Sequence, residues 1–124
     1  MGYVIVFLGG GLGAALRHGV NLAAASLLGT RFPYGTLFAN VTGSFVMGLL
    51  IAYFAFKEGG GQHWKLFLTT GVLGGYTTFS AFSLETALLY ERGELGPAAF
   101  YVLASVVLAI AGLFGGLFLV RHFS

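Results

Sequence analysis

The sequence contains no cysteine and no aspartate, and charged residues make up only 8% of its 124 residues. Without cysteine, the chain has no disulfide and no thiolate metal site. Its six Lys and Arg residues stand singly, so no basic patch is available to bind nucleic acid. About a quarter of the residues of a soluble domain are charged, whereas 57% of this chain is hydrophobic. We therefore expect a single domain, residues 1–124, that crosses a lipid bilayer several times.

Polar clusters and the two prolines divide the chain into four apolar segments, at about residues 3–28, 34–56, 65–90 and 97–121. Each segment is long enough for a membrane-spanning helix, which needs about 20 residues. Pro33 and Pro97 stand at the starts of two segments, where a missing N–H costs least. The first charge, Arg17, follows the first apolar run, so we expect a retained helix rather than a cleaved leader. The expected fold class is an all-α membrane protein.

The basic residues near the segment ends are almost balanced between the two sides of the membrane. Lys57, Lys65 and Arg121 would share the side of the N-terminus, and Arg31 and Arg92 would lie on the other. The positive-inside rule then gives almost no preference for either orientation. Insertion in both orientations and insertion in a single orientation are therefore equally compatible with the sequence.

Glycines four residues apart recur along the chain, as in the pairs Gly9/Gly13, Gly71/Gly75 and Gly112/Gly116. Such pairs let helices approach closely, either within one chain or between copies. A dimer is the simplest expectation, and two oppositely inserted copies would make it antiparallel.

The third apolar segment contains GVLGGYTTFSAFSLE at residues 71–85, which is rich in glycine and hydroxyl groups. Its glycines, threonines and tyrosine weaken the helix, and we predict a break from Gly74 to Thr77. The carbonyls freed there would suit a small hard cation such as Na⁺. Phe79 and Phe82 follow the break and form an aromatic stripe beside the hydroxyl stripe of Ser80 and Ser83. Two phenylalanines in a membrane helix usually pack or contact lipid, but these stand inside a polar cluster.

Uncharged hydrogen-bonding side chains also recur four residues apart in the second and fourth segments, at Thr36, Asn40 and Ser44 and at Tyr101 and Ser105. Serine and threonine hydroxyls can bond to carbonyls of their own helix, whereas one carbonyl cannot satisfy the amide of Asn40. A cation path would more often show carboxylate rings or carbonyl filters. These donors therefore favour a narrow anion path. An enzyme is not expected, because no base stands beside the serines and the three histidines are scattered.

Arg17 and Glu85 are the charged residues deepest within the apolar segments. Arg17 could attract an entering anion, pair with Glu85 or anchor the helix at the interface, and the sequence leaves these readings open.

Three stretches resemble signature segments of the Fluc/CrcB family of fluoride channels: GGGLGAALR at 9–17, PYGTLFANVTGSF at 33–45 and GGYTTFSAFSLE at 74–85. Tyr101 and Ser105 also match the family's fourth-helix track. The resemblance implies four transmembrane helices with a broken third helix, in an antiparallel, dual-topology homodimer of the cell (plasma or inner) membrane. It also implies two pores per dimer that export fluoride passively and so relieve its toxicity. Ala81 and Ala109 depart from the family pattern, where Thr and Ser are frequent, so the polar track could be shorter here.

The resemblance also implies roles for individual residues. The implied fluoride pore is lined by ring edges, an amide and hydroxyls, from Phe79, Phe82, Asn40, Ser105, Tyr101, Ser80 and Ser44. Arg17 and Glu85 would lie at the vestibule. A structural Na⁺, which is not transported, would be held at the dimer centre by the backbone carbonyls of Gly74 and Thr77.

Two other functions fit parts of the sequence. A proton-coupled exporter of the small multidrug type would share the size, the charge balance and a membrane carboxylate, Glu85. Those exporters keep their key glutamate in the first helix, where this chain has Arg17 and no acid. A non-transporting assembly subunit would explain the glycines but not Asn40 or a broken third segment.

Overall fold

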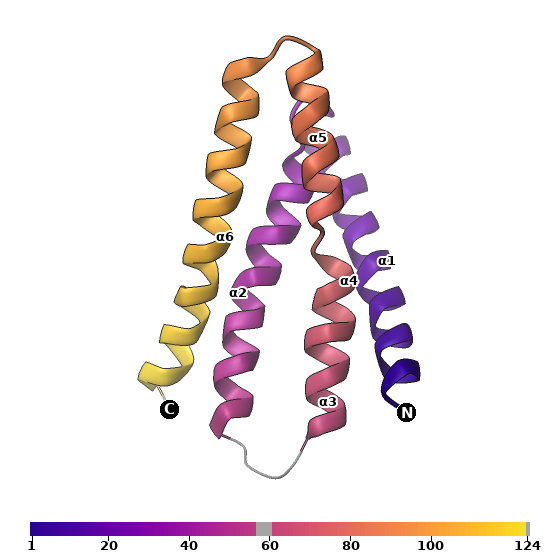
Figure 1. Cartoon of the computed structure of the whole chain (residues 1–124), viewed down its shortest axis with the longest axis vertical. Coiled ribbons are helices and arrows are strands. Elements are labelled where there is room, and N and C mark those ends of the chain that lie inside the picture. The colour runs from indigo at the N-terminus through magenta and orange to yellow at the C-terminus, as the bar shows by residue number, and fades with distance from the viewer. Residues whose placement is uncertain (57–60, 124) are drawn as a thin grey trace.

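The computed structural model describes residues 1–56 and 61–123, which form helices and no β-strand. This confirms the all-α class. Within these two ranges, three helices are long and apolar enough to cross a membrane: α1 (Gly2–Leu28), α2 (Tyr34–Phe56) and α6 (Leu95–Phe123). Between α2 and α6 lie four shorter elements: α3 (Gln62–Leu66), the π-helix η1 (Phe67–Leu73), α4 (Gly74–Tyr76) and α5 (Phe79–Glu91) (Figure 1). Lys57, which entered the charge balance, lies outside the described residues.

The third apolar segment is interrupted at Thr77 and Thr78, whose backbones are extended with φ/ψ of −91°/154° and −155°/127°. We call these two residues the break. It comes later than the predicted stretch 74–77, because Gly74 keeps helical backbone angles. Glycine lowers helix propensity without forbidding the helix. The helix restarts after Thr78, whose hydroxyl accepts a hydrogen bond from the Ala81 N–H at 3.2 Å, as an N-cap does.

Glycines bring α1 into backbone contact with η1 and α4. A Cβ at Gly9 would stand 2.8 Å from the carbonyl oxygen of Phe67, and a Cβ at Gly13 would overlap the carbonyl oxygen of Val72. Gly75 meets the backbone of α1 in the same way. These glycine pairs therefore serve contacts within the chain, one of the two uses predicted for them.

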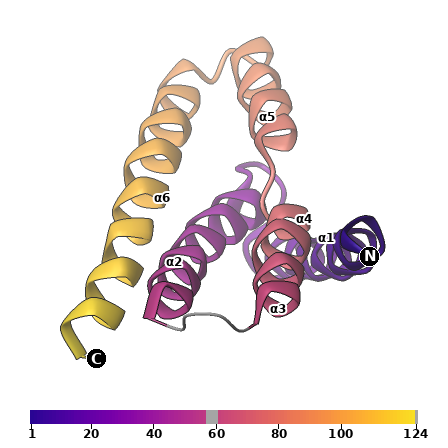
Figure 2. The same ribbon diagram turned by 60° about the horizontal axis from the view of Figure 1, so that its bottom comes forward.

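Helices α2 and α6 approach each other through a second set of glycines. A Cβ at Gly48 would overlap the carbonyl oxygen of Leu113, and a Cβ at Gly116 would overlap that of Phe45. Figure 2 shows α2 between α6 on one side and α4 with α1 on the other. The second half of the broken segment, α5, instead packs mainly against α6.

The connection between α1 and α2 meets the turn between α5 and α6 at one end of the molecule. Arg31 Nε donates to Glu94 Oε1 at 3.3 Å, and Arg92 Nη2 lies 3.2 Å from Glu94 Oε2. Arg92 Nη2 also donates to the carbonyl oxygen of Arg31 at 2.8 Å. Gly93 has a φ of 79° in this turn, a conformation that favours glycine. We call Arg31, Arg92 and Glu94 the ion-pair clasp.

Candidate functional site

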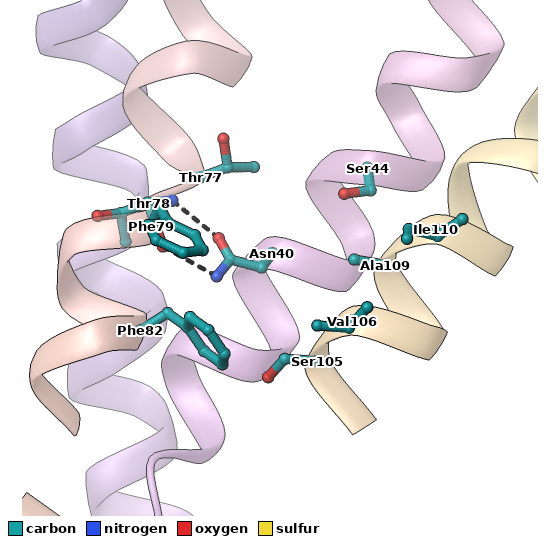
Figure 3. Close-up of a pocket in the computed structure, with 10 residues that line it drawn as sticks. All are labelled: Asn40, Ser44, Thr77, Thr78, Phe79, Phe82, Ser105, Val106, Ala109 and Ile110. Atoms are coloured by element: carbon teal, nitrogen blue, oxygen red, sulfur yellow. Dashed lines mark hydrogen bonds between the residues drawn. The ribbon is translucent and has the colours of Figure 1, made fainter. Parts of the chain in front are cut away.

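A pocket of about 290 Å³ opens beside the break, between α2, α5 and α6 (Figure 3). It is lined by Asn40, Ser44, Thr77, Thr78, Phe79, Phe82, Ser105, Val106, Ala109 and Ile110. The i, i+4 spacing in α2 and the i, i+3 spacing in α5 bring polar and aromatic side chains of distant segments to one place. Five of the seven side chains predicted for a pore line this pocket, and Tyr101 and Ser80 do not.

Asn40 is bound to the break by both ends of its side-chain amide. Its Oδ1 accepts from the N–H of Thr78 at 2.8 Å, and its Nδ2 donates to the carbonyl of Thr78 at 3.1 Å (Figure 3). The amide thus supplies hydrogen bonds that the interrupted helix cannot. A carboxamide has two N–H donors and two acceptor lone pairs, so one of each is left for the pocket. The predicted pore asparagine therefore also fixes the backbone of the break.

The carbonyl of Gly74 loses its helical partner at the break. In an unbroken helix the N–H of Thr78 would donate to it, but that N–H donates to Asn40 instead. Thr77 is extended, and its N–H and hydroxyl both donate to the carbonyl of Leu73, at 3.0 and 2.9 Å. A carbonyl released in this way is the kind of ligand that coordinates Na⁺ in broken membrane helices. The released carbonyl of Gly74 is therefore chemically suited to the predicted cation.

Phe79 and Phe82 form an aromatic pair that differs sharply in exposure. Their ring centroids are 5.5 Å apart at an interplanar angle of 48°. Phe82 is 9% exposed and lies 5.2 Å from the ring of Tyr101, whereas Phe79 is 76% exposed. Figure 3 shows the Phe82 ring pointing from α5 toward α6. Phe82 is fixed by packing within the chain, and Phe79 presents its ring to the outside of the protomer.

The hydroxyls of Tyr101 and Ser105 are buried without a hydrogen-bond partner among the described residues. Other hydroxyls in the chain follow the ordinary pattern, since those of Thr69, Thr77 and Thr86 donate to the carbonyl four residues earlier. A buried, unpaired hydroxyl costs about 1–3 kcal/mol. An unpaired group of this kind in a native protein calls for a function or an unseen partner. The Ser105 hydroxyl borders the pocket and is therefore available to a ligand there, whereas Tyr101 lies beside Thr36 and Glu85.

Glu85 lies beside Thr36 and Tyr101, and Arg17 is close enough to act on its carboxylate electrostatically. Within the described residues, however, Arg17 and Glu85 form no ion pair shorter than 4 Å; the ion pairs there are those of the clasp. Buried atoms of both side chains, Arg17 Nε and Glu85 Oε1, have no hydrogen-bond partner there. The direct pairing that the sequence left open for Arg17 is therefore not observed.

Ser80 and Thr78 make contacts that the sequence did not indicate. Ser80 is exposed, and its hydroxyl lies 3.1 Å from that of Thr78 rather than in the pocket of its own chain. Sequence reasoning also missed the capping role of Thr78. The available signal was a threonine directly before a helix, which is a frequent N-cap pattern.

The sequence is similar to a known family along nearly its whole length. The family model described as "CrcB-like protein, Camphor Resistance (CrcB)" matches residues 4–117. A protein of Rhodopseudomonas palustris (strain BisB5) named fluoride-specific ion channel FluC is 67% identical over 121 residues, 98% of each chain. Fluoride-specific ion channel FluC 2 of Nitrobacter hamburgensis is 64% identical over 122 residues, again 98% of each chain. A FluC of Granulibacter bethesdensis is 58% identical over 121 residues, 98% of this chain and 95% of the relative.

Proposed function

This chain belongs to the CrcB family, whose members are ion channels and not enzymes, and we propose that it conducts fluoride passively out across the cell (plasma or inner) membrane. Relief of fluoride toxicity would be the benefit to the cell. The relatives named fluoride-specific ion channels support fluoride as the ion.

The observation that carries this proposal is the pocket beside the break. It presents the spare N–H of Asn40, the unpaired hydroxyl of Ser105 and the rings of Phe79 and Phe82. Ring edges carry partial positive charge, so all of these groups can approach an anion. Fluoride is small and strongly hydrated, and several neutral donors can replace its water without the deep binding well that a fixed cation would create. Conduction needs binding that is strong enough to admit the ion and weak enough to release it.

The exposed surface at the break supports a homodimer. Gly74, Phe79 and Ser80 are exposed in the protomer, at the middle of a membrane-length segment. Irregular backbone at that depth is tolerated only where it is buried in protein or lines a wet cavity. A second copy would supply that cover. The balanced basic residues favour opposite orientation of the two copies, and two pockets would give two pores per dimer.

The carbonyls of Gly74 and Thr77 would hold a structural Na⁺ between the two copies. Support for this site comes from the Gly74 carbonyl, which has lost its helical partner to Asn40. The ion would supply positive charge that neutralises carbonyl dipoles facing one another across the dimer. Asn40 would support the site from behind by keeping the break open.

Fluoride efflux from liposomes tests the proposal directly. Vesicles with the purified protein are loaded with potassium fluoride, or in parallel with potassium chloride, a potassium ionophore is added so that K⁺ leaves with the anion and balances its charge, and the external anion is followed by an electrode. We expect fluoride efflux that protein-free vesicles lack, and far slower chloride efflux. No fluoride efflux, or equal efflux of the two ions, would contradict the proposal.

One observation favours a proton-coupled exporter as the second candidate. Glu85 has a buried, unpaired oxygen beside Tyr101 and could carry a proton within the membrane. This function predicts that cells expressing the protein resist organic cations and that Glu85→Gln abolishes the resistance. A fluoride channel predicts no such resistance in either case.

A further inference from the structure

Phe32 connects the ion-pair clasp to the aromatic residues of the site. It follows Arg31 directly in the connection between α1 and α2. Its ring meets the ring of Tyr101 edge-on, with centroids 5.5 Å apart at 86°. Tyr101 in turn lies 5.2 Å from Phe82, a pocket residue. Three aromatic rings in series, joined by two contacts, thus run from the end of the molecule to the pocket.

Tyr101 depends on packing for its position. It is fully buried, and its hydroxyl forms no hydrogen bond among the described residues. Its side chain is therefore fixed by the residues of one hydrophobic cluster, which are Phe82, Leu89 and Ala98 with the partly buried Phe32, Leu37 and Val102. Of these, Phe32 alone comes from a connection rather than a helix, so its position depends on what holds that connection.

The clasp holds the connection between α1 and α2 at Arg31, the residue before Phe32, through both its side chain and its backbone carbonyl. The Arg31 side chain binds Glu94, and the Arg31 carbonyl accepts from Arg92. The side chain of Glu94 is only 22% exposed, although that of Arg31 is 89% exposed. A single exposed ion pair contributes little, but a network around one half-buried carboxylate holds its geometry better.

We propose that Phe32 is a positioning residue, held by the clasp of Arg31, Arg92 and Glu94, that fixes the ring of Tyr101 and through it the Phe82 wall of the pocket. The clasp thereby controls how strictly the pocket discriminates between fluoride and a larger halide. The link to selectivity rests on the proposed function, whereas the control of the Tyr101 ring does not.

The physical basis is that a narrow binding site is sensitive to small displacements of the groups that line it. Misplacing a contacting group by about 1 Å can change a rate by about 10²-fold. Removal of the Phe32 ring leaves space beside Tyr101, which then has no hydrogen bond to keep it in place. Phe82 would follow Tyr101, and the pocket would accept chloride more readily.

Two variants and one control test the selectivity link in liposomes. Phe32→Ala removes the ring, and Glu94→Gln keeps the shape of Glu94 without its charge. The control is Phe100→Ala, because Phe100 also lies beside Phe32, with ring centroids 6.0 Å apart, but is 61% exposed and outside the buried cluster around Tyr101. We expect the fluoride-to-chloride flux ratio to fall about tenfold in Phe32→Ala, and Phe32→Leu to restore most of it. Phe100→Ala should keep the ratio.

Ionic strength separates the clasp from a general loss of stability. The Debye length falls from about 10 Å at 0.1 M to about 3 Å at 1 M, so concentrated N-methylglucamine isethionate, added at constant sodium concentration, weakens the clasp. The flux ratio of the unmodified protein should then approach that of Glu94→Gln, which should itself respond little to salt. If Glu94→Gln leaves the fluoride-to-chloride flux ratio unchanged, the clasp does not control selectivity.

A spectroscopic measurement tests the positioning independently of flux. 3-Fluorotyrosine at position 101 should give one narrow ¹⁹F resonance in the unmodified protein. We expect that resonance to broaden or divide in Phe32→Ala and to stay narrow in Phe100→Ala. An unchanged resonance in Phe32→Ala would overturn the inference. If the unmodified protein conducts no fluoride but the resonance responds to Phe32→Ala, the proposed function fails and the positioning role stands.

Discussion

Asn40 and Thr78 are joined by two hydrogen bonds, from Thr78 N–H to Asn40 Oδ1 at 2.8 Å and from Asn40 Nδ2 to the Thr78 carbonyl at 3.1 Å. The two residues are 38 positions apart, and this pairing holds the broken segment in its extended form. The same amide borders the pocket, so one side chain stabilises the break and contributes a donor to the proposed path.

Replacing Asn40 with aspartate should impair both roles. The carboxylate keeps the bond from the Thr78 N–H but cannot donate to the Thr78 carbonyl, and its charge repels an anion. We expect at least a tenfold fall in fluoride efflux and a loss of about 1–3 kcal/mol in the free energy of unfolding. Efflux and thermal unfolding measure the two effects. Thr86→Val is the control, because that hydroxyl bonds to its own helix at Phe82. Normal efflux from Asn40→Asp would exclude the residue from the path.

The buried hydroxyls of Tyr101 and Ser105 should matter for conduction and not for stability. Since neither has a partner among the described residues, Tyr101→Phe and Ser105→Ala should leave the free energy of unfolding unchanged or raise it by about 1 kcal/mol. If the hydroxyls contact the ion, both variants should conduct more slowly. Tyr90→Phe is a matched control, because Tyr90 is 66% exposed. Reduced stability with unchanged efflux would instead identify purely structural hydroxyls.

Substitution of Phe82 should lower both stability and fluoride efflux, whereas substitution of Phe79 should lower fluoride efflux alone. Phe82→Ile changes a buried ring packed on Tyr101, so it should lower the free energy of unfolding by about 1–3 kcal/mol as well as the efflux. Phe79→Ile changes a largely exposed ring and should change the protomer's stability by less than about 0.5 kcal/mol. It should still suppress fluoride efflux. Unimpaired efflux in Phe79→Ile would show that its ring does not face the ion.

The glycine contacts between α1 and η1 predict a strong positional difference between two similar substitutions. Gly13→Ala would place a methyl group on the Val72 carbonyl and should destabilise the protein by about 1–3 kcal/mol. Gly19→Ala, in the same helix, meets no atom within 4 Å. It should leave stability unchanged or raise it by about 0.5–1 kcal/mol, because alanine favours helix over glycine. Thermal unfolding in detergent compares the two, and equal destabilisation would argue against the observed α1 contact.

Sodium should stabilise the protein if carbonyls of Gly74 and Thr77 bind it. A ligand that binds only the folded state adds RT ln(1 + [L]/Kd) to stability, about 2.7 kcal/mol at 100 times Kd. The unfolding temperature should therefore rise with sodium concentration and not with N-methylglucamine at equal ionic strength. Asn40→Asp should weaken the sodium effect, because it loosens the break. Identical unfolding in both salts would contradict the site.

Much of the helix layout could be predicted from the sequence because it depends on local properties. Apolar length and proline position predicted a second segment at 34–56, and α2 spans Tyr34–Phe56. The last helix starts at Leu95, before the predicted residue 97, because the first turn needs no N–H from Pro97. Side-chain spacing likewise brought Asn40 and Ser44 to one wall of the pocket.

What the sequence could not predict depends on contacts between distant residues. The break was expected from Gly74, but Asn40 fixes it at Thr78, and local helix propensity carries no information about that pairing. The same holds for the clasp, since the sequence does not indicate that Arg31 and Glu94 meet.

The packing of α5 against α6 also has a consequence for the order of biosynthesis. A chain that has been synthesised only as far as α5 can already form the glycine contacts of α1 with η1 and α4, but it lacks the main partner of α5. The pocket is likewise missing a wall until Ser105, Val106, Ala109 and Ile110 have been added. Insertion of the last helix is therefore the step that completes the pocket of the chain, and a chain truncated before Leu95 would carry α5 into the bilayer without that partner.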